Sequence, residues 1–208
     1  MTYTMASNVG VIISVAPFFT AILSHLFLKK EEKMGAGFFI GFAVAMVGIV
    51  LISTNGASLK LNPFGDVLAL LAAFIWACYS ILSRRISEYA YNTILTTRRI
   101  FCYGILFMIP AMFLFDFKPG LQRFADPVHL LNLLFLGLGA SALCFVTWNS
   151  AVKLLGAIKT SVYIYLVPVI TVAASFLILH EPLTWATCAG TILTLGGLLL
   201  SQKNQFKK

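Results

Sequence analysis

Charged residues are scarce in this sequence. Of its 208 residues, only 11% are Asp, Glu, Lys or Arg, whereas 60% are hydrophobic. A water-soluble domain carries about 25% charged residues, because its surface must face water. So little charge cannot cover a water-exposed surface, and the mean hydropathy is +0.93. The composition therefore predicts that most of the surface faces a lipid bilayer, which is the expected partner of this protein.

The features that carry chemistry in enzymes and metalloproteins are also missing. The four cysteines lie inside apolar runs, with no CxxC or Cys/His ligand spacing, so a disulfide framework or zinc site is not expected: Cys78, Cys102, Cys144 and Cys188. There is no GxSG, no HExxH and no pair of carboxylates inside an apolar run, and the three histidines are scattered near run ends. We therefore expect no enzyme, no catalytic residue, no cofactor and no metal.

Acidic residues are the rarest charges, 7 against 15 basic ones, which gives a net charge of +8. The basic residues do not form the patch of a nucleic-acid binder, because they lie between the apolar runs. Twelve of the fifteen fall on alternate connections, and the other side holds only Lys60, Lys118 and Arg123. The positive-inside rule then predicts a multi-pass protein of the cell inner (cytoplasmic) membrane with a cytoplasmic C-terminus.

Long apolar runs are what the sequence has in abundance. A helix that spans the hydrocarbon region needs about 20 mostly apolar residues, because every backbone polar group must be satisfied within the segment. Seven runs of about this length are present, at residues 5–28, 35–53, 64–82, 93–115, 130–152, 160–179 and 183–201. The predicted fold class is all-α, a polytopic bundle of seven transmembrane helices without an extramembrane domain.

The first two runs and the last two are copies of one another. Residues 6–20 align with residues 157–171, which places Pro17 over Pro168. With a two-residue insertion, Glu32 falls over Glu181, Gly41 over Gly190 and Gly48 over Gly197. The copies are five helices apart, so they have opposite orientations in the membrane. Inverted repeats of this kind are typical of transporters, in which two halves rock around a site at the midplane.

The repeated residues have a structural and a gating interpretation. Pro17 and Pro168 each remove a backbone donor and can kink a helix, either to open a cavity or only to shape its packing. The glycines are seven residues apart, so each pair lies on one helix face and permits close contact with a neighbour. Glu32 and Glu181 lie in short connections and are expected to be turn or gate residues.

Four stretches carry a resemblance to a known family. They are residues 3–8 leading to Pro17, residues 65–79 with 83–85, residues 148–157, and residues 168–190. In this order and spacing they resemble the EamA-domain branch of the drug/metabolite transporter superfamily. The resemblance implies a fold of two five-helix EamA domains that form an inverted repeat, with ten helices in all.

The resemblance implies a domain organisation. Residues 1–55 correspond to the last two helices of a first EamA repeat, 56–203 to a complete second repeat, and 204–208 to a cytoplasmic tail. The first three helices are then missing, so the chain is expected to be an N-terminally truncated transporter. A second copy of the chain, or the missing N-terminal helices, are its expected protein partners.

The resemblance also implies a function. We expect a permease that moves a small organic metabolite, such as an amino acid or a related compound, across the cytoplasmic membrane. The alternative is an inert or partner-dependent fragment of such a transporter. A membrane-embedded enzyme is disfavoured by the missing motifs.

Family members have a central cavity between the two repeats, and aromatic residues are the first candidates to line it. Trp76 and Tyr79 are one helical turn apart and can present an aromatic wall with a hydroxyl. Tyr163 and Tyr165 stand just before Pro168, and Trp148 offers an indole donor. The alternative for each is an interfacial or packing role, since Trp and Tyr are enriched near lipid headgroups.

Polar residues inside the runs complete the candidate site. Asn149 is expected to need a partner or a substrate, because an amide buried in lipid is costly. Asn8 and Ser14 occupy the matching helix of the first repeat. Arg99 matches an arginine that the family often carries, and it either pairs with an anionic substrate group or snorkels to the cytoplasmic surface. Asp66 is expected to cap a helix.

Overall fold

The computed structural model describes residues 6–28, 35–54, 62–115, 120, 126–179 and 184–203, and these are helical without a strand. This confirms the predicted all-α fold class. The chain divides into two compact units, each described by itself below. Unit 1 comprises Met1–Leu82 and Leu155–Lys208, and unit 2 comprises Ser83–Leu154.

Six helical stretches of the described residues are long and apolar enough to cross a membrane: Val9–Phe27, Ala36–Ser53, Pro63–Ser87, Thr93–Leu114, Pro127–Leu155 and Ala157–Ile178. They correspond to the first six predicted runs and make this a multi-pass membrane protein. The seventh run is a 19-residue helix, α10 (Trp185–Lys203), which is not among the six. Its three threonines and its polar end at Gln202 and Lys203 lower its mean hydropathy.

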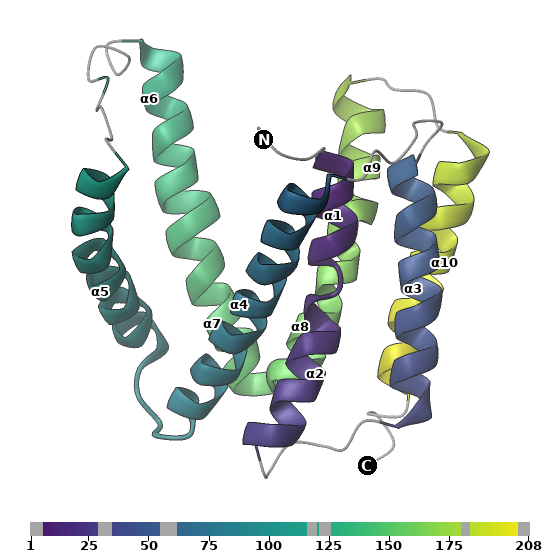
Figure 1. Ribbon diagram of the computed structural model, residues 1–208, viewed down its shortest axis with the longest axis horizontal. Helices are drawn as coiled ribbons and strands as arrows, with labels where there is room; N and C mark the ends of the chain where they lie inside the picture. The colour runs from purple at the N-terminus through teal and green to yellow at the C-terminus, as the bar shows by residue number, and fades with distance from the viewer. Residues whose placement is uncertain are drawn as a thin grey trace. The chain divides into compact units, whose positions relative to one another are not determined.

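In unit 1, α3 (Ala36–Thr54) and α10 run side by side, and Figure 1 shows them as neighbours along their length. Glycine is required where they meet. A Cβ atom on Gly48 would lie 2.5 Å from the Gly190 carbonyl oxygen, and one on Gly190 would lie 2.6 Å from the Gly48 oxygen. A Cβ on Gly197 would lie 2.6 Å from the Gly41 oxygen, and the reverse distance is 2.5 Å.

These contacts make the helix pair antiparallel and symmetric. Gly41 meets Gly197 and Gly48 meets Gly190, so position rises along α3 as it falls along α10. If each glycine is replaced by its counterpart in the other repeat copy, the contact of Gly41 with Gly197 becomes the contact of Gly190 with Gly48. The same symmetry is found in an isologous interface between two subunits. The antiparallel direction is the one that an inverted repeat predicts. Ser201 of α10 also donates from Oγ to the Phe38 carbonyl oxygen at 3.4 Å.

The core of unit 1 is built from the first and last helices of the chain. α2 (Ala16–Phe27) packs against α8 (Ala157–Val162), and the buried side chains form one cluster that also includes α3 and α10. The cluster comprises Ala21, Phe38, Ala45, Ile49, Ile158, Val162, Tyr165 and Leu198. Segments more than 130 residues apart in the sequence therefore share one hydrophobic core.

α4 (Pro63–Ser87) begins with a reciprocal cap and ends in unit 2. The Asp66 N–H donates to the Asn62 carbonyl at 2.9 Å, while the Asp66 carboxylate accepts the Asn62 N–H at 3.1 Å. The predicted capping role of Asp66 is therefore confirmed. A ring contact joins α4 to α2, where Phe74 and Phe19 meet edge to face with centroids 5.6 Å apart.

Unit 2 consists of the end of α4, then α5 (Thr93–Leu114), α6 (Pro127–Leu134), η2 (Phe135–Leu143) and α7 (Cys144–Leu155). Asn92 caps α5 through its side-chain oxygen, which accepts the N–H groups of Ile94 and Leu95. α6, η2 and α7 follow without a break, and η2 is a π-helix.

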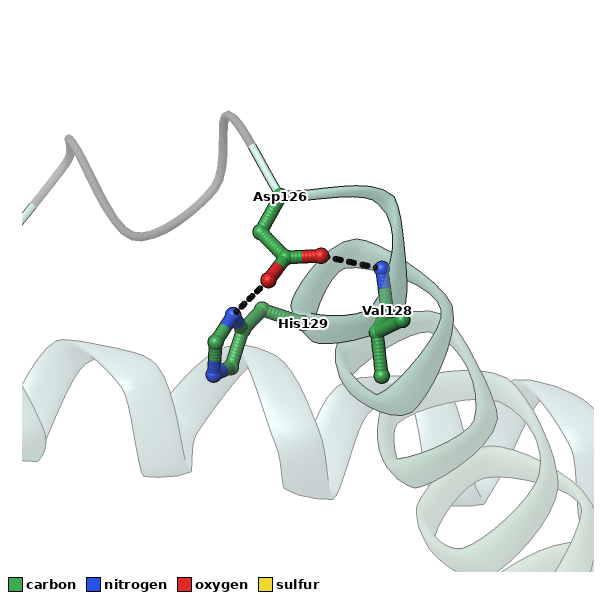
Figure 2. A network of polar contacts seen from close by, with 3 residues as sticks. All are labelled: Asp126, Val128 and His129. Atoms are coloured by element: carbon green, nitrogen blue, oxygen red, sulfur yellow. Dashed lines mark hydrogen bonds and ion pairs between the residues drawn. The ribbon is translucent and has the colours of Figure 1, made fainter.

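The start of α6 is held by a second cap (Figure 2). Asp126 accepts the Val128 N–H at 2.8 Å, and its other carboxylate oxygen lies 3.2 Å from Nδ1 of His129. A carboxylate at a helix N-terminus also interacts favourably with the helix dipole. This acidic group therefore has a local structural role at one end of the long helix.

Candidate functional site

The first membrane span of unit 1 is broken at its middle. α1 (Ala6–Ile13) ends before Ser14 and Val15, and α2 begins at Ala16. Proline at position 17 has no N–H, so the α-helical bond to the Ile13 carbonyl cannot form. The chain tightens instead, and the Val15 N–H donates to the Ile12 oxygen at 3.0 Å.

The last of the six spans, Ala157–Ile178, is interrupted at the equivalent place in its α-helical hydrogen bonding, while its helical course continues. α8 passes into a 3₁₀ turn, η3 (Tyr163–Tyr165), and α9 (Leu166–Leu179) follows with Pro168 in its first turn. The Leu166 N–H donates to the Tyr163 oxygen, which is the repeat counterpart of the Val15–Ile12 bond. Both breaks thus share one hydrogen-bond pattern, set by a proline two residues further along.

A side-chain bond is repeated as well. Thr20 donates from Oγ1 to the Ala16 oxygen at 2.9 Å, and Thr171 donates from Oγ1 to the Val167 oxygen at the same distance. These are equivalent positions in the two copies. The repeated sequence therefore produces the same local structure twice.

The two breaks lie near the middle of their spans. Pro17 is the ninth of the 19 residues of Val9–Phe27, and Pro168 is the twelfth of the 22 residues of Ala157–Ile178. A helix broken at membrane depth exposes backbone groups that would otherwise bond within the helix, and broken helices of this kind form transporter binding sites. Because α2 packs on α8, both broken spans belong to one packed unit.

Ser14 and Tyr165 occupy equivalent positions, three residues before their prolines. Ser14 is buried and its hydroxyl donates to the Gly10 carbonyl oxygen at 2.8 Å. Tyr165 is fully buried in the core cluster, and its hydroxyl has no hydrogen-bond partner among the described residues. Leaving such a group unsatisfied costs about 1 to 3 kcal/mol, so the Tyr165 hydroxyl would gain a partner if the packing around it opened.

The structure separates Tyr163 from Tyr165. Tyr163 is 41% exposed, whereas Tyr165 is inaccessible. Residues two apart in a 3₁₀ turn point in different directions, because the turn has about three residues per revolution. Of the two tyrosines, Tyr165 alone reaches the core cluster of unit 1.

Trp76 and Tyr79 are brought together on α4. Their ring centroids are 5.6 Å apart with an interplanar angle of 35°, and both side chains are half-buried. They follow Phe74, which packs on Phe19 of α2, so the pair lies two to five residues beyond the contact with a broken span. A tilted aromatic pair of this kind can bind the apolar part of a small molecule.

Unit 2 holds the other candidates. Asn149 of α7 is buried, and its Nδ2 donates to Oγ1 of Thr97 on α5 at 3.0 Å. Trp148 is half-buried. Arg99 is exposed in the second turn of α5, as snorkelling to the surface requires. Its predicted pairing with an anionic group stays a prediction.

The bond between Asn149 and Thr97 should couple α5 to α7. We expect Asn149→Ala and Thr97→Val each to lower the free energy of unfolding, with a coupling energy of about 1 kcal/mol in a double-mutant cycle. Thr96→Val is the matched control, because the Thr96 hydroxyl donates to the carbonyl oxygen of Asn92, the N-cap of the same helix. Coupling of Asn149→Ala to Thr96→Val as strong as to Thr97→Val would contradict this role. The measurement is denaturant unfolding in mixed micelles.

Several predicted residues lie outside what the structure describes. Glu32 and Glu181 are among the residues not described, and so is the side chain of Asn8, whose backbone belongs to α1. Conversely, residue patterns did not single out Thr97 or Arg84 as site residues. The Arg84 guanidinium donates to the Val152 and Lys153 carbonyls at 3.4 and 2.8 Å. The alternating basic connections marked Arg84 only as an orientation charge.

Comparison with known proteins identifies the family. The sequence matches the EamA-like transporter family over residues 1–54 and 63–202, nearly the whole chain. The chain belongs to the EamA-like transporter family. This EamA protein is 30% identical to an uncharacterized transporter of Archaeoglobus fulgidus, over 99% of its own length and 70% of the relative. It is 26% identical to the uncharacterized transporter YyaM of Bacillus subtilis strain 168, over 96% of its length and 65% of the relative.

A solved structure supports the same fold. A protein crystal structure with 20% sequence identity superposes on this EamA chain with a TM-score of 0.80, covering all of it and 71% of the other chain. The family match and the relatives confirm the resemblance to EamA transporters that was inferred from the residues. The chain spans about two thirds of the length of the two curated relatives.

Proposed function

We propose that this protein is a permease that moves a small organic metabolite, such as an amino acid or a related compound, across the cytoplasmic membrane without chemical change. The observation that carries the proposal is the pair of equivalent helix breaks before Pro17 and Pro168, each near the middle of its span. Transport is the activity for which the family and its relatives are named.

The residues around the breaks fit a substrate with polar and apolar parts. The Tyr165 hydroxyl is buried and without a partner among the described residues, and it would bond a polar group of the substrate once the packing around it opens during transport. Ser14 would do the same from the other copy, and Trp76 with Tyr79 would contact an apolar part. The close glycine contact would hold α3 and α10 together beside these residues during transport.

A second candidate is a unit that transports only together with a partner, either another copy of the chain or further helices of the same family. The observation that favours this alternative is the share of the relatives that the chain covers, 70% and 65% of the two described above. The Arg99 guanidinium would then contribute an anion contact only in the assembled transporter.

Uptake by proteoliposomes tests the proposal. Purified protein should give saturable uptake of at least one member of a labelled metabolite panel that begins with amino acids. Tyr165→Phe should raise KM about tenfold at an unchanged protein level, as expected when a buried hydrogen bond to the substrate is lost. Tyr103→Phe is the control, because Tyr103 is 63% exposed on α5.

The dependence on protein density separates the two candidates. Initial uptake that rises linearly with the protein-to-lipid ratio supports a single-chain permease, whereas a rise with its square supports a transporter assembled from two copies. Uptake of the whole panel no faster than in protein-free liposomes, at every density, would refute transport by this chain alone or as a pair.

A further inference from the structure

A small polar cavity lies in unit 2, where α4 ends, α5 begins and α7 ends. Its volume is about 20 Å³, and its lining includes Ser83, Tyr91, Thr93, Asn149 and Lys153. A cavity needs roughly 10–15 Å³ to hold one water-sized atom. It can therefore take one oxygen atom of a larger group that remains outside. None of the residues proposed above to bind the substrate around the helix breaks lines it.

Two hydrogen-bond donors on the wall of this cavity favour a charged oxygen. The Ser83 side chain is 9% exposed, and its hydroxyl has no partner among the described residues. Lys153 is half-buried and donates from Nζ to the Tyr91 carbonyl oxygen at 3.0 Å, which uses one of the three ammonium hydrogens. The other two can serve a ligand beside Ser83.

The surrounding charge is positive. Lys153 accompanies four arginines on the adjacent ends of α4 and α5: Arg84, Arg85, Arg98 and Arg99. Thr93 is the first residue of the 22-residue α5, so the positive end of that helix dipole also faces this region. The acids in the described part of unit 2 are Glu88 and Asp126. Glu88 lies between the lining residues Ser87 and Tyr91, so near the cavity one negative charge stands against five positive ones. Asp126 is 27 residues from Lys153 along one continuous helical stretch, roughly 40 Å away.

Two exposed tyrosines near the cavity, one of which lines it, favour a position at a membrane surface. Tyr89 and Tyr91 are 67% and 58% exposed, and their rings stack with centroids 6.1 Å apart. Exposed tyrosines at the end of a span are typical of the headgroup region, where one side of the ring is apolar and the hydroxyl is wet. Basic pockets between helices at this depth are the kind that bind anionic headgroups.

We propose that this cavity binds an anionic phosphate group, with one phosphate oxygen held between the Ser83 hydroxyl and the Lys153 ammonium. The phosphate belongs either to an anionic lipid headgroup or to a free phosphate ion. Arg84 keeps the site in shape, because it holds the end of α7 by donating to the Val152 and Lys153 carbonyls. The binding does not depend on transport and joins three helix ends of unit 2.

Thermal unfolding of the purified full chain in a neutral detergent tests the proposal. The midpoint is followed while short-chain phosphatidylglycerol, phosphatidylcholine of the same chain length, or inorganic phosphate is added at constant ionic strength. A saturable rise with phosphatidylglycerol but not with phosphatidylcholine or phosphate assigns the site to a lipid headgroup. A rise with inorganic phosphate as well assigns it to the phosphate group itself.

Variants localise the effect. Ser83→Ala and Lys153→Gln should each weaken the apparent affinity about tenfold, as loss of one charge-assisted hydrogen bond predicts. Ser150→Ala is the matched control, because the Ser150 hydroxyl bonds to Val146 within α7. The unfolding midpoint without ligand shows separately whether each variant folds.

Three results would overturn the proposal. They are no rise with any phosphate compound, an equal rise with phosphatidylcholine, and full affinity in folded Ser83→Ala and Lys153→Gln. The second would show that acyl chains stabilise the protein, and the third would place the phosphate elsewhere.

Discussion

Gly197→Ala should lower the free energy of unfolding by about 2 to 3 kcal/mol, the upper range for forcing extra volume into a packed site. The new Cβ would meet the backbone of α3 at Ala45 and Gly41. Backbone cannot move aside as the end of a flexible side chain can, so the two helices must separate. Denaturant unfolding in mixed micelles measures the change.

The neighbouring residue provides the control. A Cβ on Gly196 would have nothing within 4 Å, so Gly196→Ala should leave stability unchanged or raise it by up to about 1 kcal/mol, because alanine favours a helix. By the symmetry of the contact, Gly48→Ala should cost as much as Gly197→Ala. Equal stability of the Gly196 and Gly197 variants would contradict the close approach of α3 and α10.

Pro17→Ala and Pro168→Ala should each reduce the initial rate of transport about tenfold or more while the protein remains folded. A proline inside a helix disfavours the helix by about 3 kcal/mol. Alanine restores the backbone donor and removes the ring, so α-helical hydrogen bonding can continue through the break. Straightening either span would remove the backbone groups and the side-chain arrangement proposed to bind substrate. The measurement is initial uptake by proteoliposomes, with the helical content checked by circular dichroism.

Pro110→Ala is the matched control for that experiment. Pro110 lies inside α5, where the helix passes through it without a break, and its side chain is exposed. Transport by Pro110→Ala should equal that of the unaltered protein. A loss as large as in the other two variants would show that proline removal acts through general folding and not through the midplane breaks.

Local patterns predicted the local structure well, because its causes are close in sequence. Apolar runs predicted the spans, and the i, i+3 spacing placed Trp76 and Tyr79 one helical turn apart, where the structure shows their rings in contact. The seven-residue glycine spacing predicted a flat helix face. It did not predict that the two glycine faces meet each other, since that depends on which of many helices becomes the neighbour.

The parts of the site that escaped prediction depend on contacts between distant residues. Asn149 was expected to need a partner, yet Thr97 lies 52 residues away and no pattern connects them. Arg84 was interpreted by its charge alone, although its bonds to the α7 carbonyls span 68 and 69 residues. Tyr163 and Tyr165 looked equivalent, and the 3₁₀ turn gave them opposite environments.

The π-helix η2 changes how positions on either side of it are compared. Its hydrogen bonds reach five residues instead of four, so each residue turns the chain through a smaller angle than in an α-helix. Over the nine residues from Phe135 to Leu143 this difference accumulates. A helical wheel that uses the α-helical period from α6 into α7 would therefore give Asn149 an incorrect angular position around the helix axis. Positions for cross-links or spin labels on this span should therefore be chosen with a separate helical wheel for α7, which begins at Cys144.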